Sequence, residues 1–473
     1  MSCRPTLRSF CPCVVAMLMV VLSHQAWSRD FPDVGAVLEA VTPELAKAEN
    51  LSADIGVIVR STNPDMPLQK SGIAAGDIIM EVAGARIDGL ETLRDVLDRI
   101  AGLPDFKIWV VRGTQELEIA VRRAFEEPDD DFGTRSGGLD DFPDGSGYVV
   151  RDVYFATNRN KVESTTPANV FGGDRGALTL GIASVTIPRS HLPGELEGPS
   201  LLSLEFSQDP NKHIVLAALK EQDADAFYAD LGKRLAETES KSALLFVHGY
   251  NVRFEDAARR TAQMAYDLQF KGAPGFFSWP SQGRYLGYPV DEANVEFART
   301  DFRAFLDEFL QRSGAENIYV IAHSMGNRLV TEVLARLFRE NAPARARIRE
   351  IILAAPDVDA DVFKRDIIPT LTGPNQSVTL YASSGDWALK ASKKWHGYPR
   401  AGDSGEHLVV SDALVTIDAS EIAADLLGHT YFAQATPIVS DIRSILQGRY
   451  KPADRKELTP VDSDLGKYWT FAK

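Results

Sequence analysis

The chain has 473 residues, of which 44% are hydrophobic and 25% are charged, a composition typical of a soluble globular protein. This length exceeds one ordinary domain and predicts two or three. The formal net charge of −15, from 51 basic and 66 acidic residues, argues against nucleic acid as a partner.

Residues 1–28 have the pattern of a secretory signal peptide. Two arginines precede an apolar stretch at 14–22, and small residues follow at 26 and 28. The apolar stretch is too short to span a membrane, and no later run reaches the roughly 18 apolar residues that a span needs. All three cysteines lie in this segment, so the mature chain needs no disulfide. We therefore expect an exported protein, periplasmic or secreted, without a membrane span after cleavage.

Residues 30–123 predict a small first domain of short strands and helices. We expect strands at 57–59, 78–79 and 108–111, and a helix at 91–100.

The motifs of this segment occur in the order seen in bacterial PDZ domains. They are Gly-Ala-Val-Leu at 35–38, Gly-Val-Ile-Val at 56–59 and Ser-Gly-Ile-Ala-Ala-Gly-Asp-Ile-Ile at 71–79. The segment resembles such domains, which bind an extended C-terminal peptide as an added strand. The resemblance implies that Val34, Gly35 and Ala36 bind the peptide carboxylate and that the helix at 91–100 forms the groove wall. A PDZ fold used only as a scaffold contact is the alternative.

Residues 124–147 are mostly Glu, Asp, Gly, Ser and Pro. Such a segment is too polar for a core of its own, and its like charges extend it. We expect an acidic flexible linker between two independent domains.

Residues 148–473 predict a second domain with a mostly parallel α/β sheet, because strand and helix patterns alternate. Expected strands lie at 149–156, 177–187, 213–219, 243–247, 275–278, 318–321, 348–355, 377–382 and 414–417, with only helical stretches after the last. This order matches the α/β-hydrolase fold.

Ala322-His-Ser324-Met-Gly326 predicts a nucleophile elbow, the sharp strand-to-helix turn that presents a catalytic serine. Small residues stand two before and two after the serine, where a large side chain would collide with the turn. Apolar residues recur at helical spacing after the motif, so the dipole of a helix would support an oxyanion.

A serine nucleophile needs a histidine base and a carboxylate that orients it, in the chain order Ser, acid, His. His429 is the candidate base because, unlike His396 and His407, it follows the expected last strand. Asp386 is the candidate acid at the end of the strand at 377–382. Asp357 and Asp359, which follow the preceding strand, remain its rivals.

An oxyanion hole needs two backbone N–H donors, and Met325 and Tyr250 are the candidates. Tyr250 belongs to the loop that begins His248-Gly249, in which His248 is expected to be structural. The pocket would include this loop together with aromatic residues, Trp279, Tyr285 and Trp387. Too little chain separates the strands after the elbow for a cap, so we expect an open site without a lid.

No metal-ligand spacing occurs, and no glycine-rich phosphate loop follows a strand, so neither a metal nor a cofactor is expected. Residues 172–176, Gly-Gly-Asp-Arg-Gly, are expected to form a turn.

Several motifs together resemble a bacterial α/β-hydrolase family of unknown function. They are Tyr-Phe-Ala-Thr-Asn-Arg at 154–159, Val-His-Gly-Tyr-Asn at 247–251, Phe-Ser-Trp-Pro-Ser at 277–281 and the elbow. The resemblance implies an esterase-like serine hydrolase whose substrate is unassigned. We therefore expect a small ester-like substrate, with amide or thioester cleavage, or a non-catalytic PDZ adaptor, as alternatives.

Overall fold

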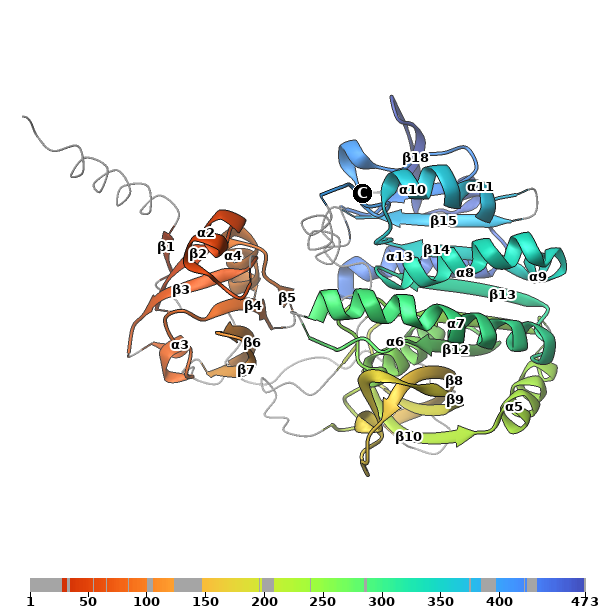
Figure 1. Ribbon diagram of the computed structural model, residues 1–473, viewed down its shortest axis with the longest axis horizontal. Helices are drawn as coiled ribbons and strands as arrows, with labels where there is room; N and C mark the ends of the chain where they lie inside the picture. Colours follow the sequence, from red (N-terminus) through yellow and green to blue (C-terminus); the bar gives the residue numbers. More distant parts are fainter. Residues whose placement is uncertain are drawn as a thin grey trace, which may run out of the picture. The chain divides into compact units, whose positions relative to one another are not determined.

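The computed structural model describes most of residues 28–471 as two compact units, 28–122 and 147–471 (Figure 1). None of the described helices combines the length and apolarity needed to cross a membrane. Residues outside the description are 1–27, 32–34, 54, 65, 84, 100–104, 123–146, 195, 198–207, 239, 285–286, 374–375, 384–396, 421, 423–431 and 472–473.

The described residues of the N-terminal unit form an antiparallel sheet with three helices. Its strand order is β1-β2-β3-β4-β6-β7, and β5 pairs with β4. The strands are β1 (Ser28–Phe31), β2 (Ala36–Ala40), β3 (Val57–Thr62), β4 (Ile78–Val82), β5 (Ala85–Arg86), β6 (Asp105–Arg112) and β7 (Gln115–Arg122). The helices are α2 (Pro43–Glu49), α3 (Pro67–Lys70) and α4 (Leu90–Arg99).

Apolar residues of the strands and of α4 form the core of this unit. Leu38 of β2, Val59 of β3 and Ile108 of β6 are buried in one cluster with Leu93 and Val96 of α4. The spacing of three between the two α4 residues places both on one helix face. The expected strands and the helix at 91–100 are present, and the unit has the PDZ-like arrangement that the motifs indicate.

The C-terminal unit contains an eleven-stranded sheet in the order β10-β9-β8-β12-β11-β13-β14-β15-β16-β18-β17. Strands from β8 to β18 along this order are parallel, and the pairs at both ends are antiparallel. The strands are β8 (Tyr148–Lys161), β9 (Phe171–Pro188), β10 (Val215–Gln222), β11 (Ser242–Val247), β12 (Ala273–Ser278), β13 (Asn317–His323), β14 (Ile348–Ala354), β15 (Ser377–Ala382), β16 (Val415–Asp418), β17 (Leu458–Ser463) and β18 (Gly466–Phe471).

Helices cover both faces of this sheet. Successive residues of a strand point to opposite faces. Phe276 of β12 packs on Phe254 of α6, with ring centroids 5.4 Å apart, whereas Phe277 packs on Phe302 of α7 at 4.9 Å. The α-helices are α5 (Ala224–Ala236), α6 (Phe254–Asp267), α7 (Tyr288–Arg312), α8 (Gly326–Glu340), α9 (Ala342–Arg347), α10 (Ala360–Val362), α11 (Ile368–Leu371) and α13 (Phe432–Leu446), with a π-helical turn at Phe363–Ile367. This architecture confirms the expected mostly parallel α/β-hydrolase fold.

The expected turn at 172–176 is wrong, because these residues belong to β9. The glycines allow close contact with β8. A Cβ on Gly176 would lie 2.4 Å from the carbonyl oxygen of Arg159, and one on Gly172 would lie 2.5 Å from the Asn160 side chain. Glycine inside a strand marks such a close backbone approach.

The expectation that only helices follow the strand at 414–417 is also wrong. β17 and β18 form an antiparallel hairpin, and β18 pairs in parallel with β16. Lys-Tyr-Trp-Thr-Phe at 467–471, rich in aromatic and β-branched residues, was the sequence signal for a strand.

Candidate active site

Ser324 lies on a strained turn between β13 and α8. Its φ is +48°, a value that residues other than glycine adopt rarely, and its side chain is buried. The turn is held by backbone and side-chain contacts. The Ser324 N–H donates to the Ala354 carbonyl at 2.9 Å, and the Asn327 amide donates to the carbonyls of Ser324 and Ala354 at 3.0 and 3.1 Å. Strain maintained in this way is typical of functional sites.

Two glycines let the elbow and the His248-Gly249 loop interlock. A Cβ on Gly326 would lie 2.3 Å from the His248 carbonyl oxygen. A Cβ on Gly249 would lie 2.9 Å from both the Cβ of Ser324 and Nδ1 of His323. Any side chain at either position would therefore push the loop away from the serine.

Two groups at the elbow, the Ser324 hydroxyl and the Met325 N–H, are without a hydrogen-bond partner of these kinds in the described part of the chain. Oγ of Ser324 makes no hydrogen bond to a described residue. No described backbone oxygen accepts the N–H of Met325, which precedes the first residue of α8. An anion that formed beside Ser324 would therefore meet a donor at the positive end of a helix dipole.

His248 is buried under its loop. Nδ1 contacts the Gly249 carbonyl at 2.9 Å, and Nε2 lies 3.3 Å from Nη2 of Arg159. Because arginine only donates, Nε2 accepts and Nδ1 carries the proton. Burial, together with the charge of Arg159, lowers the pKa of His248 well below its ordinary value. The ring is therefore neutral and fixed, and a structural role for His248 stays a prediction.

Trp279 packs against the same loop. Its fully buried indole stacks on the His248 ring with centroids 5.0 Å apart, and Nε1 donates to the His248 carbonyl at 2.8 Å. The expectation that Trp279 supplies pocket surface stays a prediction. Tyr250 is also buried, and its ring packs edge-on against Tyr288.

Arg159 connects the segments around this loop. Its buried guanidinium donates to the carbonyls of Val252 at 2.7 Å, Ser281 at 2.8 Å and Gly172 at 3.0 Å, and its Nε donates to Oγ of Ser278 at 2.8 Å. Burial lowers the pKa of Arg159 to about 9, so the group remains charged at neutral pH. The sequence analysis assigned no role to this residue, although it closes the Tyr-Phe-Ala-Thr-Asn-Arg motif.

Asp291 of α7 binds the same region from the other side. Its carboxylate accepts from Oγ of Ser281 at 2.5 Å and from the backbone N–H groups of Gln282 at 2.6 Å and Asn251 at 3.2 Å. Burial raises the pKa of Asp291 above its ordinary value. Arg159 and Asp291 thus fix the loop that carries the candidate donor Tyr250.

Asp357, a rival for the triad acid, is fully buried in an ion-pair cluster. Its Oδ1 accepts from Nε of Arg400 at 2.8 Å. Its Oδ2 accepts from the Tyr288 hydroxyl at 2.8 Å and lies 3.2 Å from Nη2 of Arg328. The Asp357 N–H donates to the Ser324 carbonyl at 3.2 Å. Both oxygens are therefore engaged, directly beside the elbow.

Asp359, the other rival, is the N-cap of α10. Its carboxylate accepts from the backbone N–H groups of Asp361 and Val362, each at 3.0 Å. This is the role in which Asp and Asn are favoured at helix starts. A capping carboxylate is already committed to these donors.

The remaining sequence-based candidates lie outside the described residues. They are His429, Asp386, Tyr285, Trp387 and Val34. The stem of the segment that carries Asp386 is described, because the Ser383 N–H donates to the Gly402 carbonyl at 2.9 Å. The Arg400–Asp357 ion pair ties the same stem to the elbow. Asp386 is three residues along the chain from Ser383, whose N–H is held by the contact with Gly402. Its role as the triad acid stays a prediction.

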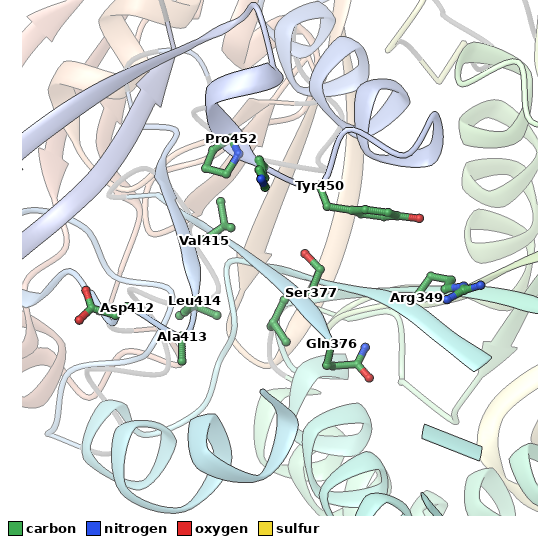
Figure 2. Close-up of a pocket in the computed structure, with 11 residues that line it drawn as sticks. Arg349, Gln376, Ser377, Asp412, Ala413, Leu414, Val415, Tyr450 and Pro452 are labelled. Carbon is green, nitrogen blue, oxygen red and sulfur yellow. The ribbon is translucent and has the colours of Figure 1, made fainter. Parts of the chain in front are cut away.

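A separate pocket lies at the amino ends of the parallel strands, whereas Ser324 lies at their carboxyl ends. Figure 2 shows this pocket of about 390 Å³ at the amino ends of β14, β15 and β16, lined by Arg349, Ser377 and Val415 among others. Parallel strands place their carboxyl ends, where Ser324 follows β13, at the other edge. None of the candidate catalytic residues that the structure describes lines this pocket. No three His, Asp, Glu or Cys side chains among the described residues are grouped to hold a metal.

The parallel sheet and the sharp turn at Ser324 are features of the α/β-hydrolase fold. Residues 223–449 match the family described as "Alpha/beta hydrolase of unknown function (DUF900)". This stretch of the chain is therefore an α/β-hydrolase domain of that family.

Curated relatives match shorter parts of the chain. A "Probable periplasmic serine endoprotease DegP-like" of Halomonas elongata is 26% identical over 204 residues, which are 43% of this chain and 42% of the relative. A protein of the same name from Brucella suis is 27% identical over 139 residues, 25% of this chain and 26% of the relative. The chain thus spans less than half the length of either relative.

Two solved structures align with separate parts of the chain. The HtrA3 PDZ domain bound to a phage-derived ligand, FGRWV, has 24% sequence identity and a TM-score of 0.18, covering 20% of this chain and 86% of that one. A CIB-like hydrolase from Thermoplasma acidophilum has 16% identity and a TM-score of 0.26, covering 44% of this chain and 88% of that one.

Proposed function

We propose that this protein is an exported serine hydrolase that cleaves carboxylic esters, with Ser324 as nucleophile, His429 as base and Asp386 as the acid. The observation that carries the proposal is Ser324 itself. It is a buried serine with φ of +48°, and its Oγ makes no hydrogen bond to a described residue. Such a turn is the position of the nucleophile in α/β-hydrolases.

In the proposed reaction, Oγ of Ser324 attacks the ester carbonyl while His429 takes its proton. The carbonyl oxygen becomes an anion, which the N–H groups of Met325 and Tyr250 stabilise. Collapse of this intermediate expels the alcohol, which receives the proton from His429. Water then attacks the acyl-enzyme by the same route and releases the acid. Asp386 orients His429 throughout.

The contacts of the rival carboxylates support Asp386 as the acid. Asp357 already binds Arg400, Arg328 and Tyr288. A carboxylate between two guanidinium groups is a weaker partner for an imidazolium than one without a competing cation. Asp386 also follows the described end of β15, and a carboxyl-terminal strand end is where this fold collects its reacting groups.

Amide cleavage is the second candidate, because the curated relatives are named as serine endoproteases. The same triad can cleave esters, thioesters or amides, so the fold does not discriminate among them. The relatives are named as periplasmic proteins, which also supports export of this chain. The PDZ-like unit is proposed to bind a peptide or protein C-terminus, with Gly35 and Ala36 near its carboxylate.

The test is a panel of p-nitrophenyl esters of graded chain length, with matched thioesters and peptide anilides, on wild type and Ser324→Ala. We expect ester turnover that Ser324→Ala abolishes, together with labelling of Ser324 by a fluorophosphonate. A protein that folds but neither labels nor turns over any substrate would leave the adaptor interpretation. Anilide turnover that exceeds ester turnover would assign the enzyme to amide chemistry.

A further inference from the structure

Strand β2 of the N-terminal unit is paired along both of its edges. β3 occupies one edge, and β1 occupies the other (Figure 1). The β1 pairing is antiparallel, with Ser28 opposite Glu39, Arg29 opposite Leu38, Asp30 opposite Val37 and Phe31 opposite Ala36. Four successive positions of β2 therefore already have a partner strand on the side away from β3.

A peptide that binds by strand addition needs an edge whose N–H and C=O groups are unpaired. β3 is an interior strand of the sheet, so the edge of β2 that faces β1 is the one that remains for a peptide. A peptide whose carboxylate lies at Gly35 and Ala36 would run antiparallel to β2, with its last residue opposite Ala36. β1 runs in this direction, and its last residue, Phe31, is opposite Ala36.

We propose that β1, of which residues 29–31 remain after the expected removal of residues 1–28, is a built-in competitor. It occupies the peptide-binding edge of β2 and must leave before a peptide with a free C-terminus can bind. The proposal rests on the peptide binding proposed above for the PDZ-like unit. It assigns to β1 a regulatory role, because affinity for the peptide then depends on how often β1 is released.

The covalent link gives β1 an advantage over a free peptide. Only residues 32–35 separate Phe31 from Ala36, and a short linker gives its attached segment an effective concentration on the order of millimolar. A free peptide at micromolar concentration therefore competes with a tethered strand whose effective concentration is far higher. However, β1 has only four residues, three of them after the expected cleavage, so it forms few backbone hydrogen bonds to β2 and can be displaced.

The start of β2 is held from the β3 side, independently of β1. The Gly35 carbonyl accepts from the Asn63 N–H at 2.8 Å. Gly35 has φ of +70°, and a Cβ there would lie 2.1 Å from Cβ of Met66, so the backbone packs directly on that side chain. Release of β1 would therefore expose an edge whose geometry is already set.

Proline substitution tests this competition. Successive N–H groups of a strand point to opposite sides, so in Arg29→Pro/Asp30→Pro one of the two prolines removes a donor that faces β2. The matched control, Arg29→Ala/Asp30→Ala, changes the same side chains but keeps both N–H groups. Binding of fluorescent FGRWV to the full chain is measured by polarisation for wild type and both variants.

We expect the proline variant to bind about tenfold more tightly than wild type if β1 is docked nine-tenths of the time, because the apparent Kd scales inversely with the open fraction. The alanine control should resemble wild type. Hydrogen exchange should show the amides of residues 36–40 more exposed in the free proline variant and protected again by the peptide, with the β3 and β4 amides unchanged, which verifies that the unit is folded.

Equal affinities of wild type and the proline variant would overturn the proposal, since β1 would then not compete. Binding to none of the three proteins would overturn it as well, because β1 would have no site to occlude. Absence of binding to all three proteins would also remove peptide binding from the proposed function. Equal affinities would leave peptide binding in place. Ester turnover by Ser324 is independent of both outcomes.

Discussion

The substitution Asp357→Asn separates a structural carboxylate from a catalytic one. Asparagine has the same shape but no charge, so it removes the partner of Arg400 without creating a cavity. Asp357 is 0% exposed and Arg400 is 4% exposed, so the ion pair is shielded from solvent. Arg328 retains a second carboxylate, Glu292, at 2.5 Å, whereas no other acidic partner of the Arg400 side chain is recorded among the described residues.

Removal of one member of a buried ion pair costs about 3–5 kcal/mol, because the other charge stays buried. The Tyr288 hydroxyl can still donate to the new amide oxygen, so the lower end of that range, about 3 kcal/mol, is expected for Asp357→Asn. The free energy of unfolding is measured by urea titration, and kcat is measured on a short p-nitrophenyl ester well below the midpoint. We expect a large loss of stability with turnover retained.

Asp359→Asn is the matched control, because asparagine caps a helix as well as aspartate does and should change stability by less than about 0.5 kcal/mol. Asp386→Asn is the catalytic comparison and should lower kcat by about 10⁴ with little change in stability. A folded Asp357→Asn protein of native stability whose kcat falls by that factor would refute the reasoning and make Asp357 the triad acid.

Four further results are expected. Ser324→Ala and His429→Ala should each lower kcat by at least about 10³ with an unchanged circular dichroism spectrum, and near-native turnover of either would place the chemistry elsewhere. Gly326→Ala should cost about 1–3 kcal/mol and lower kcat about 10²-fold by displacing the oxyanion loop. Gly232→Ala in α5, where a Cβ has no neighbour nearer than 3.8 Å, is its control. Burial disfavours the charged form of His191, but hydrogen bonds to two carboxylates outweigh it and raise its pKa to about 9. The contribution of this raised pKa to the free energy of unfolding, up to about 3 kcal/mol, should be complete below about pH 6.5 and be lost as the pH rises through 9. His191→Gln should abolish this loss of stability between about pH 6.5 and 9, measured by urea titrations at several pH values. A variant that still lost stability over this range would exclude His191 as the cause. Finally, rates on a soluble ester should rise hyperbolically without a jump at the solubility limit, whereas interfacial activation would contradict an open site.

The elbow could be predicted from sequence because its requirements are local. Residues 317–340 contain all of its parts: a strand, a small residue, the serine, another small residue and a helix. Each part restricts which residue types can occur at its positions. The parallel sheet was equally readable, since its buried strands are near-continuous apolar runs. Gly249 was recognisable only as part of a motif, although its contact with Ser324 is what requires a glycine.

The polar contacts around the site could not be predicted, because their partners are far apart in the chain. Asp357 and Arg400 are separated by 43 residues, and nothing in either local sequence marks the ion pair. Asp357 was therefore considered only as a rival for the triad acid. Residues 172–176 were misread for a related reason. Glycines that permit strands to approach closely look the same in sequence as glycines that make a turn.

Arg159 has a consequence for how the hydrolase domain folds. Its guanidinium joins chain segments 13 to 122 residues away. An intermediate that buried Arg159 before these carbonyls were in place would carry an unsatisfied cation, at a cost of several kcal/mol. The loops around the nucleophile are therefore expected to become ordered together, in one cooperative step after β8, β9 and β12 have paired. A fragment that ends before Ser278 would lack two of the five acceptors, Ser278 and Ser281, and could not hold the loop that follows β11.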